Sequence, residues 1–353
     1  MKRTSPLVRR SIPLALFLGL MLTTACAFPV DQIGPLPTAT PPGGAEPIRL
    51  GRGVNLGNAL EAPREGDWGV VLQEEYFQLI KDAGFDSVRI PIRWSAHAKL
   101  QPPYTIDPNF FDRVDWAVEQ ALSRGLVVVI NIHHYDELIA DPAAQEERFL
   151  AIWRQIAEHY ADYPPQLLFE LLNEPHDALD MPTWYALYTK ALAIVRESNP
   201  TRDVIIGGGN WNSIGGLYGL ILPPDDPHII ATFHYYSPFE FTHQGAEWVS
   251  GASRWLGTPW NGTEADKAAI EKDLDEAVAW AKENGRRLFM GEFGAYSKAD
   301  MDSRVRWTSF VARSAEARGI EWAYWEFCAG FGIYDRVTHT WNEPLLRALI
   351  PDR

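Results

Sequence analysis

The sequence predicts an α/β fold, a single-domain (β/α)8 TIM barrel. Short strand-like runs alternate with helical segments over roughly 300 residues, and eight such runs can be counted. Helical patterns repeatedly end in a glycine just before the next run, and polar residues gather at the ends of the runs. The fifth run fits this alternation least well, and a doubly wound open sheet of similar length is the structural alternative.

The expected strands follow one another at the spacing of βα units. In chain order they cover residues 51–56, 87–92, 127–133, 167–173, 204–208, 229–235, 287–292 and 321–325. The helix before the third strand shows the helical period, with Phe111, Val114, Val118 and Leu122 on one face. Glycines that follow helical segments and precede strands are Gly84, Gly125, Gly285 and Gly319.

The segment before residue 48 has the features of an export signal and a tether. A basic start and an apolar run over residues 12–22, too short to span a bilayer comfortably, predict a signal peptide over residues 1–27. Residues 22–26, LTTAC, resemble a bacterial lipoprotein processing site with Cys26 as the lipidated residue, although Ala25-Cys26-Ala27 also suits ordinary signal cleavage. Residues 28–47 are proline-rich and predict an extended tether before a catalytic domain at 48–353. We therefore expect an exported protein, either lipid-anchored at the cell surface or secreted.

Composition restricts the partners of this domain. A formal net charge of −14 argues against nucleic acid, because no basic surplus is available to neutralise phosphates. Fourteen tryptophans suit a neutral ligand with flat apolar faces. Once Cys26 is lipidated or removed, Cys328 has no disulfide partner and is expected to be a small buried hydrophobe. A monomer is the default expectation.

Polar residues fall at the same end of nearly every expected strand, and in a parallel barrel these ends meet on the face that carries active sites. The residues are Arg89, His133, His134, Asn173, Glu174, His234, Tyr236, Glu292 and Trp325. Two carboxylates in a groove with aromatic, amide and imidazole groups are typical of glycoside hydrolysis, in which one carboxylic acid protonates the leaving oxygen and the other carboxylate attacks or activates water. Sugar rings offer apolar faces to aromatic side chains and hydroxyls to Asn, His and Glu.

Seven ordered motifs carry a family resemblance that runs from about Gly51 to the C-terminus. They are RGVNLGNALEAP, VRIPIRW, VINIHHY, LLNEP, FHYYSPFEFTHQGAEW, GEFGAY and AYWEFCAGFGIY. Together they resemble the glycoside hydrolase family 5 cellulases, and within them a bacterial endoglucanase subgroup that also contains mannan-cleaving members. The resemblance implies a retaining endo-β-1,4-glucanase with Glu174 as acid/base and Glu292 as nucleophile, the carboxyls about 5–5.5 Å apart.

The resemblance also implies supporting roles. Arg89 and Tyr236 would hold the nucleophile and keep its pKa low, and Asn173 would bind the sugar 2-hydroxyl. His234 would partner the acid/base. Substrate-binding roles fall on His133, on His134 and on the platform Trp325, while outer positions are Asn58, Glu61, His243 and Trp248. Glu61 could instead cap a local turn, and Trp248 could pack the insertion after the sixth strand.

The resemblance leaves the substrate open among β-1,4-glucan, mixed-linkage glucan, xyloglucan and mannan or glucomannan, with β-mannanase activity as the alternative. No cofactor and no metal are expected. A metal-dependent hydrolase could use the histidines and glutamates as ligands, but the His-x-His pair of a first-strand metal site is absent. A non-catalytic carbohydrate-binding protein is the alternative from another class, although a pure binder has no need for both Glu174 and Glu292.

Overall fold

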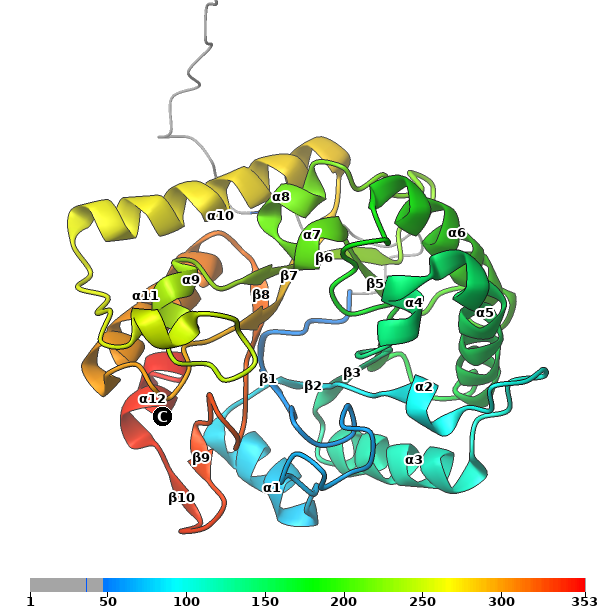
Figure 1. The fold of residues 1–353 in the computed structure, drawn as a ribbon, viewed down its shortest axis with the longest axis horizontal. Coiled ribbons are helices and arrows are strands. Elements are labelled where there is room, and N and C mark those ends of the chain that lie inside the picture. Colours follow the sequence, from blue (N-terminus) through cyan, green and yellow to red (C-terminus); the bar gives the residue numbers. More distant parts are fainter. Residues whose placement is uncertain (1–35, 37–46, 353) are drawn as a thin grey trace, which may run out of the picture. The chain divides into compact units, whose positions relative to one another are not determined.

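The computed structural model describes Leu36 and residues 47–352, and its strands form one closed parallel barrel (Figure 1). The strands are β1 Arg52–Asn55, β2 Ser87–Ile90, β3 Val127–Asn131, β4 Leu167–Glu170, β5 Val204–Gly207, β6 Ile229–Tyr235, β7 Arg287–Phe293 and β8 Glu321–Tyr324. Each strand pairs with its neighbour in sequence, and β1 closes the barrel by pairing in parallel with β8. The predicted (β/α)8 barrel is confirmed, and the open sheet is excluded by this closure.

Helices surround the strands in Figure 1. The long ones are α1 Glu74–Ala83, α3 Pro108–Ser123, α5 Pro142–His159, α6 Met181–Ser198, α10 Glu264–Asn284 and α11 Met301–Ala317. Shorter elements are α2 Trp94–His97, α4 Asp136–Ala140, α7 Gly209–Asn212, α8 Ile214–Leu217, α9 Phe239–Thr242, the 3-10 helix η2 Ala252–Trp255 and α12 Glu343–Leu349, together with an antiparallel pair, β9 Tyr334–Asp335 and β10 Thr340–Trp341. Within the described residues no helix is both long and apolar enough to cross a membrane.

Helix ends follow local sequence signals. The Asp107 side chain accepts a hydrogen bond from the Asn109 backbone N–H at the start of α3, and Thr263 forms a capping box with Asp266 at the start of α10. The four glycines expected after helices all have positive φ, for example 97° at Gly84. A left-handed residue ends the helix and lets the chain turn back into the next strand, a conformation that glycine adopts without steric cost.

The barrel interior changes from apolar to polar toward the carboxyl ends of the strands. Val129 and Leu168 are fully buried in an apolar cluster inside the barrel. Two residues further along β3 and β4, Asn131 and Glu170 are also fully buried. Because side chains two apart along a strand point to the same face, Asn131 and Glu170 lie above the apolar layer, at the end where the loops begin.

Several strands are shorter than expected. Strands β3 and β4 end at Asn131 and Glu170, so His133, Asn173 and Glu174 lie in the loops that follow. The alternation rule therefore does not decide which way these side chains point. Cys328 is buried and unpaired, as expected. The predicted signal peptide, the lipidation site Cys26 and almost all of the tether lie outside the described residues.

Candidate active site

Arg89 on β2 connects the polar residues of the barrel interior. Its side chain is fully buried and forms a bidentate pair with Glu170, with N–O distances of 2.6 and 2.8 Å. The same guanidinium donates to Glu292 at 2.7 Å, to Asn55 Oδ1 at 2.9 Å and to Asn173 Oδ1 at 2.7 Å. A buried arginine is tolerated only with such pairing, so its position and those of its partners are fixed together.

Glu292 on β7 is held from two sides. Arg89 donates to its Oε1, and the Tyr236 hydroxyl donates to its Oε2 at 2.9 Å. The β6–β7 register shifts between Phe233 and His234, which sets His234 opposite Glu292. The structure thus brings together the residues that the sequence predicted around this carboxylate.

The net pKa of Glu292 differs from the expectation. Burial raises it above its usual range, and the opposing effects of His234 and Arg89 reduce the rise without cancelling it. The prediction that its partners keep this pKa low is therefore wrong. The physical reason is that burial disfavours the charged carboxylate more than Arg89 and His234 favour it, and the nearby Glu174 also raises this pKa.

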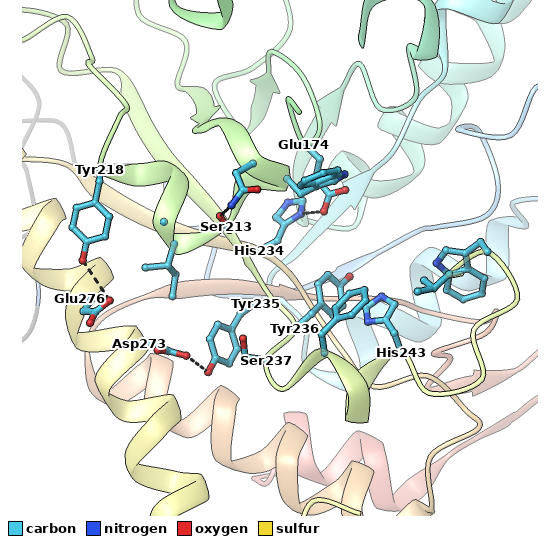
Figure 2. A pocket seen from close by; sticks show the side chains of 17 residues that line it. Glu174, Ser213, Tyr218, His234, Tyr235, Tyr236, Ser237, His243, Asp273 and Glu276 are labelled. Carbon is cyan, nitrogen blue, oxygen red and sulfur yellow. Dashed lines mark hydrogen bonds and ion pairs between the residues drawn. The ribbon is translucent and has the colours of Figure 1, made fainter. Parts of the chain in front are cut away.

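Glu174 lies beside His234, whose Nδ1 is 2.7 Å from Glu174 Oε1 (Figure 2). Burial raises the pKa of Glu174 to about 7, opposed mainly by the positive charge of Arg89. Burial lowers the pKa of His234 to about 4, so this imidazole is neutral near pH 7. Glu174, His234 and Glu292 each place one ligand atom within 4.8 Å of the others.

That cluster has a composition that could bind a metal ion. Both oxygens of Glu292 already accept hydrogen bonds, from Arg89 and Tyr236. A divalent cation would have to compete with a fixed guanidinium charge 2.7 Å away from one of its ligands. The donor set therefore suits hydrogen bonding better than metal coordination.

Trp325 and the two histidines after β3 form one aromatic group. The His133 ring is parallel to Trp325, with centroids 5.6 Å apart and 7° between the planes, and Asn131 Nδ2 lies 3.1 Å from His133 Nδ1. His134 meets His133 edge-on at 4.7 Å and also contacts Trp68. Burial lowers the pKa of His134 to about 4 and that of His133 well below its usual range, so both rings are neutral hydrogen-bonding groups near pH 7.

The outer predicted residues divide into two groups. Glu61 is only 1% exposed, and its carboxylate accepts from the backbone N–H groups of Asn58 and Ala59. It thus caps the turn, which is the alternative weighed for it. His243 and Trp248 instead line a cavity, and Trp248 remains 60% exposed while contacting Tyr296 edge-on at 4.9 Å.

This cavity measures about 800 Å³ and reaches from Glu174, His234 and Tyr236 to helix α10 (Figure 2). Its lining includes several residues that the sequence did not single out, among them Trp211, Tyr218, Asp273 and Glu276. Trp325 and His133 are not part of the lining, so this space opens on the Glu174 side of the cluster. Exposed aromatic rings in a cavity next to two carboxylates suit a sugar chain.

Sequence reasoning missed two buried partners of Arg89, Glu170 and Asn55. A signal was available for Glu170, because a carboxylate inside an apolar strand run must find a partner when it is buried. Asn55 likewise ends an apolar run, and its Nδ2 donates to the Gly291 carbonyl at 3.0 Å. Neither partner could be named without the barrel that brings strands β1, β2 and β4 together.

Residues 51–330 match the model of the cellulases, glycosyl hydrolase family 5. The chain belongs to glycosyl hydrolase family 5. It is 41% identical over 326 residues to Endoglucanase H of Acetivibrio thermocellus, a match that covers 88% of this chain and 35% of that protein. Endoglucanase B of Clostridium cellulovorans is 31% identical over 320 residues, covering 83% and 71% of the two chains. This chain thus spans about a third of the length of Endoglucanase H.

This chain is also similar to solved structures and spans nearly the whole length of their chains. Thermotoga maritima Cel5A in complex with cellobiose is 54% identical, with a TM-score of 0.84 over 85% of this chain and 97% of that one. The same protein in complex with mannotriose gives the same values. A subunit of the Clostridioides difficile cellulose synthase, CcsZ, is 40% identical, with a TM-score of 0.83 over 86% of this chain and 100% of that one.

Proposed function

We propose that this protein is an endo-acting, retaining glycoside hydrolase that cleaves β-1,4-linked glucan of the cellulose and mixed-linkage types, with glucomannan as a second substrate. The observation that carries the proposal is the pair Glu174 and Glu292, whose facing oxygens lie within 4.8 Å in unlike surroundings. Carboxyls this close leave no room for a water between them, as retention requires. The names of the relatives and the cellobiose and mannotriose complexes of Cel5A support this substrate class.

The chemistry assigns different roles to the two carboxylates. Glu292, held by Arg89 and Tyr236, attacks the anomeric carbon, while Glu174 gives its proton to the departing glycosidic oxygen. The glycosyl–Glu292 ester forms as the glycosidic bond breaks. Glu174 then takes a proton from water, which attacks the same carbon and releases the sugar and the Glu292 carboxylate.

Neighbouring residues fit binding roles in this scheme. Asn173 Oδ1 accepts from Arg89, which leaves its Nδ2 to donate to the sugar 2-hydroxyl beside the reacting carbon. Trp325, parallel to His133, offers a flat apolar face to the sugar, and neutral His133 and His134 offer hydrogen bonds to hydroxyls. His234 Nδ1 lies 2.7 Å from Glu174 Oε1. It can therefore stay hydrogen-bonded to this carboxyl while Glu174 loses its proton in the first step and takes one up in the second.

The experiment that tests this function follows reducing-end release from carboxymethylcellulose, barley glucan and glucomannan, and the anomer first formed from cello-oligosaccharides by NMR. We expect cleavage of the two glucans, slower cleavage of glucomannan, and β-anomer as the first product. Faster cleavage of glucomannan than of either glucan, with mannose at the newly formed reducing ends, would identify the protein as a β-mannanase. First release of α-anomer would overturn the retaining mechanism.

Two other classes are separated by simple measurements. Full retention of activity after overnight chelation removes a metal-dependent hydrolase, and loss that is restored by one added metal would establish it. Binding of cello-oligosaccharides without any turnover would instead make this a carbohydrate-binding protein.

The raised pKa of Glu174 predicts the alkaline limit of activity. Glu174 must be protonated to act as acid, so activity is kept below its pKa of about 7 and is lost as the pH rises through that value. We expect kcat/KM on barley glucan to fall about tenfold for each pH unit above this limit. A profile measured from pH 4 to 10 checks this, and activity that stays constant up to pH 9 would contradict it.

We further propose that the protein is exported and anchored through a lipid on Cys26. The basic start, the short apolar run and the LTTAC sequence support this proposal. In a bacterial host, the full-length protein should fractionate with membranes, and Cys26→Ser should release it. Equal release of both forms would favour simple secretion.

A further inference from the structure

Two neighbouring loop segments share an unusual backbone conformation. Glu174 has φ of 47°, in the left-handed region that residues with a side chain rarely adopt. In α7, Asn210, Trp211 and Asn212 have φ of 57°, 57° and 51°, so three consecutive residues are left-handed. Such conformations persist only where the surrounding structure holds them, and they concentrate at functional sites.

The two segments contact each other through a backbone hydrogen bond, a pair of stacked rings and a buried side-chain amide. The Trp211 N–H donates to the Pro175 carbonyl at 3.2 Å, and the Trp211 ring stacks on His176 at 4.7 Å with 16° between the planes. Asn212 is fully buried. In the amide orientation that satisfies both its atoms, its Nδ2 donates to the Gly208 carbonyl at 2.9 Å and its Oδ1 accepts from the Glu174 N–H at 3.3 Å.

Glycines make room for this arrangement. A Cβ on Gly207 would lie 2.1 Å from one terminal atom of the Asn212 amide, so the amide packs directly against the glycine backbone. A Cβ on Gly208 would lie 2.2 Å from the Gly216 carbonyl oxygen. The missing side chain at Gly207 thus leaves space for the Asn212 amide, and the one at Gly208 lets the chain pass close to Gly216.

We propose that Asn212 is a positioning residue for Glu174. By accepting the Glu174 backbone N–H, it stabilises the left-handed conformation at that residue and so sets the direction of the Cα–Cβ bond. That direction determines where the carboxyl meets the leaving oxygen, and a proton transfer depends steeply on such placement. The inference rests on the proposed role of Glu174 as acid/base, and nothing in it requires Asn212 to touch the substrate.

The test compares two substrates that differ in their need for the acid. Barley glucan has a poor leaving group that must be protonated, whereas 2,4-dinitrophenyl β-cellobioside loses its phenolate without a proton. For a retaining enzyme, kcat/KM reports formation of the glycosyl-enzyme in both cases. Asn212→Ala removes the acceptor, and Asn212→Leu removes it while filling the same space.

In the full-length protein we expect both variants to lose about ten- to a hundredfold in kcat/KM on glucan, but less than about threefold on the dinitrophenyl substrate. The ratio of the two values does not depend on the fraction of folded protein, so partial unfolding cannot imitate this result. Added azide, which attacks the glycosyl-enzyme without a base, should raise kcat of the variants on the dinitrophenyl substrate more than that of the unmodified protein.

Asn199→Ala is the matched control. Asn199 is also buried and donates to a backbone carbonyl, that of Ala157 at 2.8 Å, but it follows α6 at the opposite end of the barrel. This variant should leave the ratio between the substrates unchanged. Equal losses on both substrates in the Asn212 variants, or unchanged glucan activity in Asn212→Leu, would overturn the proposal. Failure of the unmodified protein on both substrates would instead refute the proposed function.

Discussion

Replacing Glu292 with alanine should reduce kcat/KM on β-glucan by about a thousandfold or more, because the variant can no longer form the covalent intermediate. Glu292 is only 4% exposed, and Arg89 and Tyr236 fix both of its oxygens, so no other described carboxylate can take its place without rearrangement. Reducing-end release measured on purified protein over several hours gives the required range. Glu174→Ala should lose a similar factor on glucan, where protonation of the leaving oxygen is needed.

A small nucleophile such as azide gives a second test of the role of Glu292. Alanine at position 292 leaves a space on one face of the anomeric carbon, and azide in that space should displace a good leaving group to give the α-glycosyl azide. Glu158→Ala, at an exposed position on α5, is the control and should retain full activity. Substantial glucan cleavage by the Glu292 variant would show that the nucleophile lies elsewhere.

Replacing Arg89 with methionine should lower the free energy of unfolding by about 3–5 kcal/mol at neutral pH and abolish activity. The methionine fills much of the same space but leaves the carboxylates of Glu170 and Glu292 buried without their cation. Urea unfolding followed by tryptophan fluorescence measures the loss. Arg64→Met is the control, because its pair with Asp67 is exposed, with 82% of the Arg64 side chain accessible, and pairs of this kind contribute little.

The loss of stability caused by Arg89→Met should depend on pH. Without the guanidinium, less positive charge opposes the burial of Glu292, so the pKa of Glu292 in the folded state rises further above that in the unfolded chain. The folded variant then binds more protons than its unfolded form, so its stability increases as the pH falls. We expect the stability deficit of Arg89→Met to be smaller at pH 5 than at pH 8. A deficit that is absent, or that grows on acidification, would contradict the role of Arg89 as the shared cation.

The sequence predicted the barrel because its signals are local. Apolar runs, the glycines that end helices, and residues such as Asp107 and Thr263 that begin them act within a few positions of the chain. The sequence also placed Glu174 and Glu292 at strand ends, and parallel strands bring such ends to one face. What it missed or judged wrongly depends on distant residues: the pairing of Glu170 with Arg89, and the net pKa of Glu292.

By itself, then, the sequence determined the order of strands and helices and the residue types available to the site. Only the tertiary structure decided which of them meet. Closure of the barrel puts one guanidinium between two buried carboxylates, and loop conformation directs Glu61 to a turn and Asn212 to the backbone of Glu174. The physical reason is that desolvation and charge pairing depend on distances between residues far apart in the chain, which a local pattern does not contain.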